Sequence, residues 1–264
     1  MTREASAATA AAAARLAPGV HVVPRDDDHV QVGLDPPARV IVRRDPDLLG
    51  LLDALRRGWP TPEPTASEAA LLGALDEAGL LVVAGRQAPA SGTVALVDLD
   101  LGLGPMADLL RRRGVTAATA AAPPDLYVVG SAGPVARADL DDWLSEGAPH
   151  LLLAGTGRPG SLRLGPLVEP GVTACQRCVD AAEADLDPRR TLVVEQLAAL
   201  PTAPLDPALV AVGLAWAARE AAAYVAGGRP LTWSATVDLD GPAPVVRTWQ
   251  RHPHCGCAWD VMPC

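Results

Sequence analysis

The sequence contains no lysine, and all 22 of its basic side chains are arginines. Mechanisms that need a lysine on a nucleotide phosphate or a Schiff-base lysine are therefore excluded. The formal net charge of −9 argues against nucleic-acid binding, which requires a clustered cationic surface. No run of about eighteen apolar residues is free of charge, proline and glycine, so the sequence predicts no membrane span.

The N-terminal stretch lacks the features of a secretory signal. It is rich in alanine but has no run of Leu, Val or Ile and little positive charge. We therefore expect a cytoplasmic protein in which residues 1–19 form a disordered or helical tail. The remaining length, in a chain that is 49% hydrophobic, is enough to bury a sizeable core.

Residues 20–84 form a first block of short elements. Turn-forming residues separate three β-prone stretches, and the two segments after them carry leucines at helical spacing. Thr65 and Glu68 form a capping box at the start of the second helix. The order β-β-β-α-α-β predicts a small winged-helix-like unit, with strands at 21–23, 30–34, 39–42 and 80–83 and helices at 47–57 and 67–78.

A linker over residues 85–92 leads to a second block that covers residues 93–264. Its continuous apolar strands are typical of a buried parallel sheet, and helical segments alternate with them. This pattern predicts an α/β fold with a reduced doubly wound sheet. The expected elements are strands at 93–97, 126–129 and 149–153, helices at 105–113, 139–146 and 207–226, and an antiparallel pair at 231–238 and 245–249.

Four of the five cysteines occur as two close pairs, Cys175 with Cys178 and Cys255 with Cys257. Reducing compartments keep thiols free, which favours metal ligation over disulfides. Four thiolates close a tetrahedral zinc shell and leave no open position, so we predict a structural zinc site. Two alternatives remain, namely two unrelated cysteine pairs and a site in which His252 or His254 replaces one cysteine.

A candidate nucleotide turn follows the first parallel strand, where Gly102, Gly104 and Ala107 match the dinucleotide-binding pattern. Asp98 and Asp100 occupy the same turn, and their carboxylates would repel a pyrophosphate. We therefore expect a scaffold without nucleotide and predict no catalytic or cofactor-binding residues. His150 begins an apolar strand, which is typical of a structural histidine, and a reactive thiol at Cys264 is a weaker alternative because no base accompanies it.

Two segments resemble the ThiF-like partner proteins of YcaO cyclodehydratases, which belong to the biosynthesis of azoline- and azole-containing ribosomal peptides. These segments are 165–178, reading GPLVEPGVTACQRC, and 252–257, reading HPHCGC. The resemblance implies a degenerate Rossmann-like ThiF-type domain in which all four cysteines hold structural Zn²⁺. It also implies a leader peptide and a YcaO-type cyclodehydratase as partners, with a dehydrogenase as a further candidate partner and a homodimer as a candidate assembly.

In that family the winged-helix-like unit recognises the leader peptide by strand addition. The resemblance therefore implies a peptide-binding edge on the third strand and a groove beside the last helix of the unit. Arg39, Arg43 and Arg44 would pair with acidic leader residues. The implied peptide-binding residues are Arg39, Val40, Ile41, Val42, Arg43, Ser67, Leu71, Leu72 and Leu75. Strand alternation favours a core role for about half of the apolar members.

The preferred hypothesis is a non-catalytic adaptor that binds a leader peptide and presents the attached core peptide to the cyclodehydratase. One alternative is an ATP-dependent adenylating ThiF-like enzyme. Another is a scaffold that docks subunits of a biosynthetic complex without touching peptide.

Overall fold

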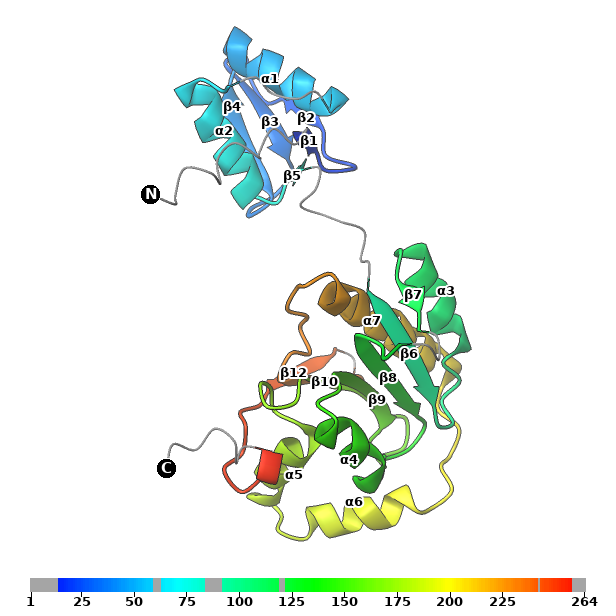
Figure 1. Ribbon diagram of the computed structural model, residues 1–264. Helices are drawn as coiled ribbons and strands as arrows, with labels where there is room; N and C mark the ends of the chain where they lie inside the picture. Colours follow the sequence, from blue (N-terminus) through cyan, green and yellow to red (C-terminus); the bar gives the residue numbers. More distant parts are fainter. Residues whose placement is uncertain (1–13, 59–62, 84–91, 119–121, 242, 258–264) are drawn as a thin grey trace. The chain divides into compact units, whose positions relative to one another are not determined.

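A computed structural model describes residues 14–58, 63–83, 92–118, 122–241 and 243–257 (Figure 1). The chain divides into two compact units, residues 1–88 and residues 89–264. The linker expected over 85–92 lies outside the described residues except for Gly92.

The first unit contains a three-stranded antiparallel sheet in the order β2-β3-β4, two helices and a separate strand pair, β1 with β5. Asp45 caps α1 by accepting from the N–H groups of Asp47 and Leu48, and Gly58 ends that helix at φ 73°. The predicted capping box of Thr65 and Glu68 starts α2. The bounds are β1 Ala14–Leu16, β2 Val22–Pro24, β3 His29–Gly33, β4 Arg39–Arg43, α1 Pro46–Arg57, α2 Ala66–Glu77 and β5 Leu81–Val83.

The expected N-terminal tail over 1–19 is wrong for residues 14–16. These residues form β1, which pairs antiparallel with β5, and the side chains of Ala14 and Leu16 are buried. A three-residue strand has no periodicity of its own, and its partner lies far along the chain, so only the tertiary structure reveals it. Residues 1–13 lie outside the described residues.

The core of the first unit lies between the sheet and its two helices. Apolar side chains from one face of β3 and β4 meet the leucines of α1 and α2, as the helical spacing predicts. The buried members include Val30, Val32, Val42, Leu51, Leu52, Leu55, Leu71 and Leu75.

The second unit is built on a seven-stranded mixed sheet in the order β12-β11-β10-β9-β8-β6-β7. Strands β6, β8 and β9 are parallel, as predicted, and β7 adds a further parallel strand, whereas β10, β11 and β12 add antiparallel pairs. Strands β7 and β10 and helices α5 and α6 were not predicted. The bounds are β6 Thr93–Asp98, α3 Gly104–Arg112, β7 Thr116–Ala117, β8 Leu126–Ser131, α4 Ala138–Ser145, β9 His150–Gly155, β10 Leu162–Val168, α5 Gln176–Ala184, α6 Arg190–Ala198, α7 Pro207–Val225, β11 Ala235–Asp238 and β12 Val245–Thr248.

Helices cover both faces of this sheet. Met106 of α3 and Leu214 of α7 pack with Val128 and Leu153 on one face. Leu140 of α4 packs with Val129 and the alternate residues of β9 on the other face. The parallel half therefore has the layers of a Rossmann-like fold.

Helix α7 is long and apolar enough to cross a membrane by length and composition alone. Its residues Ala217, Ala218 and Ala221 are buried in the main core, where the helix packs against β8, β9 and β10. A core helix passes the same test, so the finding is weak evidence for a membrane span.

His150 at the start of β9 is 1% exposed, as expected of a structural histidine. Its Nδ1 donates to the carbonyl of Ala148 at 3.0 Å, and its Nε2 is buried without a partner among the described residues. Burial lowers the pKa of His150 below the ordinary value of 6.5.

Because the unfolded chain binds a proton on His150 more readily than the folded chain, this residue should weaken folding at acidic pH. Above about pH 6.5 the ring is neutral in both states and His150 does not change the free energy of unfolding, whereas below that value the free energy of unfolding falls as the unfolded chain takes up the proton. His150→Asn keeps a donor near Ala148 and removes the titration. We expect a smaller fall in the free energy of unfolding between pH 8 and pH 5.5 in this variant, measured by urea denaturation. His21→Asn, at an exposed histidine, should retain the wild-type fall, and equal falls in all three proteins would contradict the assignment.

Candidate functional site

The four cysteines predicted as metal ligands come together in the second unit. Cys175 is the N-terminal cap residue of α5 and Cys178 lies in its first turn, while Cys255 and Cys257 lie in the segment after β12. The Sγ–Sγ distances are 3.7 Å for Cys175–Cys178, 3.5 Å for Cys175–Cys255 and 3.3 Å for Cys178–Cys257. All four Sγ atoms lie within 4.8 Å of one another.

This geometry fits a tetrahedral metal ion. Zinc–sulfur bonds of about 2.3 Å place tetrahedral sulfurs about 3.8 Å apart, close to the distances in the cluster. Three of the sulfurs belong to buried residues and the fourth, from Cys257, to a half-buried one. A donor set made only of thiolates selects Zn²⁺ over harder cations. The four residues can therefore hold one zinc ion with no position left for substrate.

The protonation of the cluster gives a physical reason for the ion. Hydrogen bonds from the thiols of Cys175 and Cys255 lower the pKa of Cys178, and the hydrogen bond to Cys178 raises the pKa of Cys175. The thiols thus stabilise one thiolate among them, and further negative charge at this spacing is repelled. A divalent cation removes that repulsion and lets all four deprotonate.

The two alternatives for these cysteines do not match the structure. The shortest Sγ–Sγ distance of 3.3 Å exceeds a disulfide bond of about 2.05 Å, and all four cysteines are free. Nδ1 of His252 accepts from the backbone N–H of His254, and its Nε2 lies 3.3 Å from Asp185 Oδ2. Among the described residues, the candidate ligand cluster contains cysteines alone. Cys264 lies outside them.

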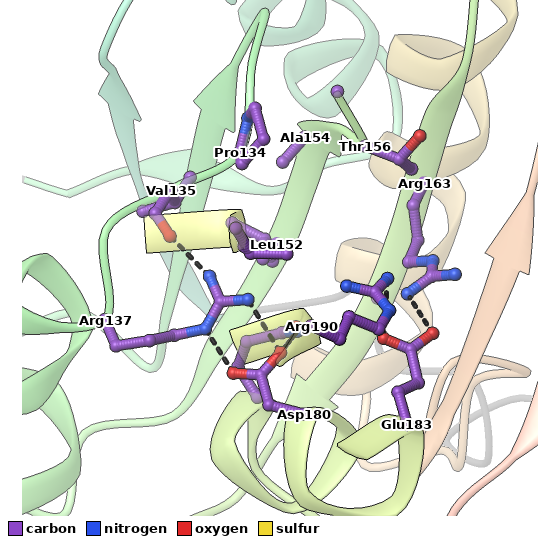
Figure 2. A pocket seen from close by; sticks show the side chains of 14 residues that line it. Pro134, Val135, Arg137, Leu152, Ala154, Thr156, Arg163, Asp180, Glu183 and Arg190 are labelled. Atoms are coloured by element: carbon purple, nitrogen blue, oxygen red, sulfur yellow. Dashed lines mark hydrogen bonds and ion pairs between the residues drawn. The ribbon is translucent and has the colours of Figure 1, made fainter. Parts of the chain in front are cut away.

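Buried ion pairs attach the cysteine-bearing helix α5 to the sheet, and Figure 2 shows them around a cavity of about 40 Å³. Arg137, from the loop after β8, donates two hydrogen bonds to Asp180, with Nη2 2.7 Å from Oδ1. Glu183 receives Arg163 Nη1 at 3.1 Å and Arg190 at 2.7 Å. Glu183 belongs to an acidic run with Asp185 and Asp187, a pattern that predicts a solvated face, but Glu183 is 8% exposed. Helical spacing of Asp180 and Glu183 on α5 is the only signal that could have indicated a shared face.

The candidate nucleotide turn lies between β6 and β8, where the strand order reverses and doubly wound sheets place ligands. Here Asp98 accepts from three consecutive backbone N–H groups, those of Leu101 at 3.0 Å, Gly102 at 2.9 Å and Leu103 at 2.7 Å. A carboxylate of the chain therefore takes the amides that would face a phosphate.

The second carboxylate of the turn bridges the crevice. Asp100 accepts from the N–H of Ala132 at 2.6 Å and from the hydroxyls of Ser131 and Thr202, each at 3.2 Å. Thr202 lies so close to Gly133 that a Cβ on Gly133 would be 2.1 Å from the Thr202 methyl group. The segment before α7 is thus packed onto the crevice.

In the first unit, β4 is the edge of its sheet and pairs with β3 alone among the described residues. Arg44 donates its backbone N–H to the carbonyl of Asp28, on the β3 side, at 2.7 Å. Every second residue of a strand points its backbone N–H and C=O toward the same neighbour, so Val42 and Val40, like Arg44, direct these groups to β3. The N–H and C=O of Ile41 therefore face the free edge.

The nine implied peptide-binding residues divide between core and surface. Val42, Leu71 and Leu75 are buried in the core of the unit, so they support the edge from within. Val40 and Leu72 are half-buried and pack against that core. Exposed positions are Arg39, Ile41, Arg43 and Ser67.

No protein-family model matches the chain, and no curated protein matches it. Solved structures share its fold. A heterocyclase in complex with substrate and cofactor superposes with a TM-score of 0.69, at 17% identity over 94% of this chain and 39% of its own. The heterocyclase TruD gives 0.67, at 20% identity over 94% and 43%. E. coli MccB gives 0.60, at 10% identity over 93% and 96%. The chain thus spans about two fifths of the length of the two heterocyclases.

If the four cysteines hold zinc, the purified chain should contain one zinc ion, and Cys175→Ala and Cys257→Ala should each lose it. Loss of a structural zinc should lower the melting temperature by roughly 10 °C, because zinc binding contributes directly to folding. Metal analysis and calorimetry measure both effects. Cys264→Ala is the matched control and should keep its zinc, whereas full zinc content in either ligand variant would refute the assignment.

Proposed function

We propose that the chain is a non-catalytic adaptor. It binds the leader peptide of a ribosomally made precursor and presents the core peptide to a YcaO-type cyclodehydratase, which forms azolines or azoles. Tethering the leader raises the effective concentration of the core peptide at the partner's site without new contacts to the core.

The likeness in fold supports this class of function. The similar structures include a heterocyclase in complex with substrate and the microcin C7 biosynthetic enzyme MccB in complex with N-formylated MccA. The second has a TM-score of 0.60 over 93% of this chain and 99% of its own. These identities lie below 20%, so the adaptor role rests on this chain's own residues.

The observation that carries the proposal is the edge of β4. Its outward backbone groups at Ile41 offer one donor and one acceptor to an extended peptide, and exposed Arg39 and Arg43 flank them. Three arginines within residues 39–44 give this edge a positive charge in a chain of net charge −9. The edge therefore suits an extended segment that carries acidic side chains.

The alternative of an adenylating enzyme conflicts with the turn after β6. The amides there are satisfied by Asp98, and Asp100 adds a second negative charge beside them. ATP would have to displace both carboxylates, and no lysine is present to neutralise its phosphates.

Leader binding can be tested at Ile41 by fluorescence anisotropy with the labelled leader encoded beside the gene. Ile41→Pro removes the outward N–H and leaves the ladder to β3 intact, since proline is tolerated at such edge positions. We expect its affinity to fall at least about fivefold, which corresponds to about 1 kcal/mol for one hydrogen bond. Ile41→Thr keeps the N–H and should bind more tightly than Ile41→Pro. Undiminished binding by Ile41→Pro would rule out strand addition at β4, and failure of every such leader to bind wild type would refute the adaptor role.

The purified chain should show no ATP–pyrophosphate exchange above background, and exchange would establish the adenylating alternative. Asp98→Ala tests whether the Asp98 carboxylate keeps anions away from the turn, because the variant frees three amides that an anion can then bind. We expect this variant to melt below wild type in chloride and to recover part of the difference in sulfate. Asp108→Ala, at an exposed aspartate of α3, controls for the general stabilising effect of sulfate. Equal sulfate responses in both variants would contradict the interpretation of Asp98.

A further inference from the structure

An open hollow of about 820 Å³ lies at the opposite end of the sheet strands from the Asp98 turn. Its lining comes from the last turn of α7 and the loop after it, and from the residues just before β6, β8 and β9. These segments of α7, β6, β8 and β9 belong to the second unit (Figure 1). The glycine at position 92 lets the end of α7 pack close to the start of β6, because a Cβ on Gly92 would lie 2.5 Å from Cβ of Val225. The volume of the hollow is in the range of ligand pockets.

Two aromatic rings form a wall of the hollow. The rings of Tyr224 and Trp233 have centroids 6.1 Å apart at an angle of 32°. Backbone hydrogen bonds from Gly227 to Tyr224 and from Gly228 to Ala223 end α7 and turn the chain back across it. This turn brings the guanidinium of Arg229 to 5.8 Å from the centroid of the Trp233 ring. The wall already accepts a guanidinium, supplied by the chain itself.

The lining also includes two carboxylates. Asp125 and Glu169 line the hollow, and the carbonyl end of the α7 dipole faces it at Val225. Burial raises the pKa of Tyr224, and the charges of Glu169 and Asp125 raise it further, so both carboxylates act on the aromatic wall. Asp125 binds the N–H and hydroxyl of Thr93 through one oxygen, Oδ2.

We propose that this hollow binds an arginine side chain of a partner polypeptide, with the guanidinium displacing Arg229 from the face of Trp233 and the carboxylates of Asp125 and Glu169 neutralising its charge. A flat guanidinium stacks on an aromatic ring, which an ammonium does less well, and the two carboxylates of the lining attract its charge. Arg229 is exposed, and none of the ion pairs among the described residues includes it. Displacing it therefore has a small energetic cost. The hollow belongs to the second unit, whereas the β4 edge belongs to the first.

The experiment uses the full chain and the peptide acetyl-Leu-Arg-Leu-amide, followed by NMR of the tryptophan indole N–H signals. The chain has six tryptophans, and Trp233→Phe identifies the signal of interest. Arg229→Ala, which loses the ring contact, identifies the same signal if Trp233→Phe does not fold. We expect the arginine peptide to shift this signal and the isosteric neutral citrulline peptide to bind at least tenfold more weakly.

Two variants test the roles of the lining residues. Arg229→Ala should bind the arginine peptide severalfold more tightly, because the internal competitor is gone. Glu169→Gln should bind it severalfold more weakly, because one neutralising charge is lost. Arg112→Ala, at an exposed arginine of α3, is the matched control and should bind like wild type. No shift at Trp233, equal affinity for arginine and citrulline, or no gain in Arg229→Ala would each overturn the proposal.

Discussion

Four cysteine sulfurs within 4.8 Å of one another impose the central constraint on the second unit. Four thiolates at this spacing would repel one another, and a shared cation would offset that repulsion. The two pairs are about eighty residues apart, so the ion would join the C-terminal segment to the start of α5. Ion pairs from Asp180 and Glu183 then carry that attachment to the sheet. Breaking one buried pair would leave an uncompensated charge, so separating α5 from the sheet is costly. The pairs therefore also hold the cysteines of α5 in place.

In the same unit, side chains of the chain itself occupy the crevice where the strand order reverses. Its strand order creates the crevice at which open α/β sheets bind ligands. Asp98 satisfies the amides of that crevice, and Asp100 and Thr202 bridge it. The fold and its activity are therefore separable, as they are for many widely used folds. Likeness to heterocyclases and MccB establishes the architecture, whereas these carboxylates bear on the chemistry.

The first unit offers what the closed crevice does not, namely unpaired backbone groups at a sheet edge. Exposed arginines on β4 discourage the edge from pairing with another copy of itself, since like charges would meet. An acidic peptide strand would instead be attracted to these arginines, because its charge is opposite. For the proposed adaptor, the open edge in the first unit and a cysteine cluster that can hold a metal ion in the second would both serve positioning.

Local sequence features by themselves determined the helices of the first unit, the parallel strands β6, β8 and β9, and the grouping of the four cysteines. Caps such as Asp45 and Thr65, apolar runs and thiol spacing act over a few residues, so they can be recognised without a fold. Tertiary structure alone decided the pairing of β1 with β5, the burial of Glu183 and the outward direction of Ile41. Each of these three features depends on a partner distant in sequence or on strand register. A distant partner and a register leave no periodic signal in the sequence.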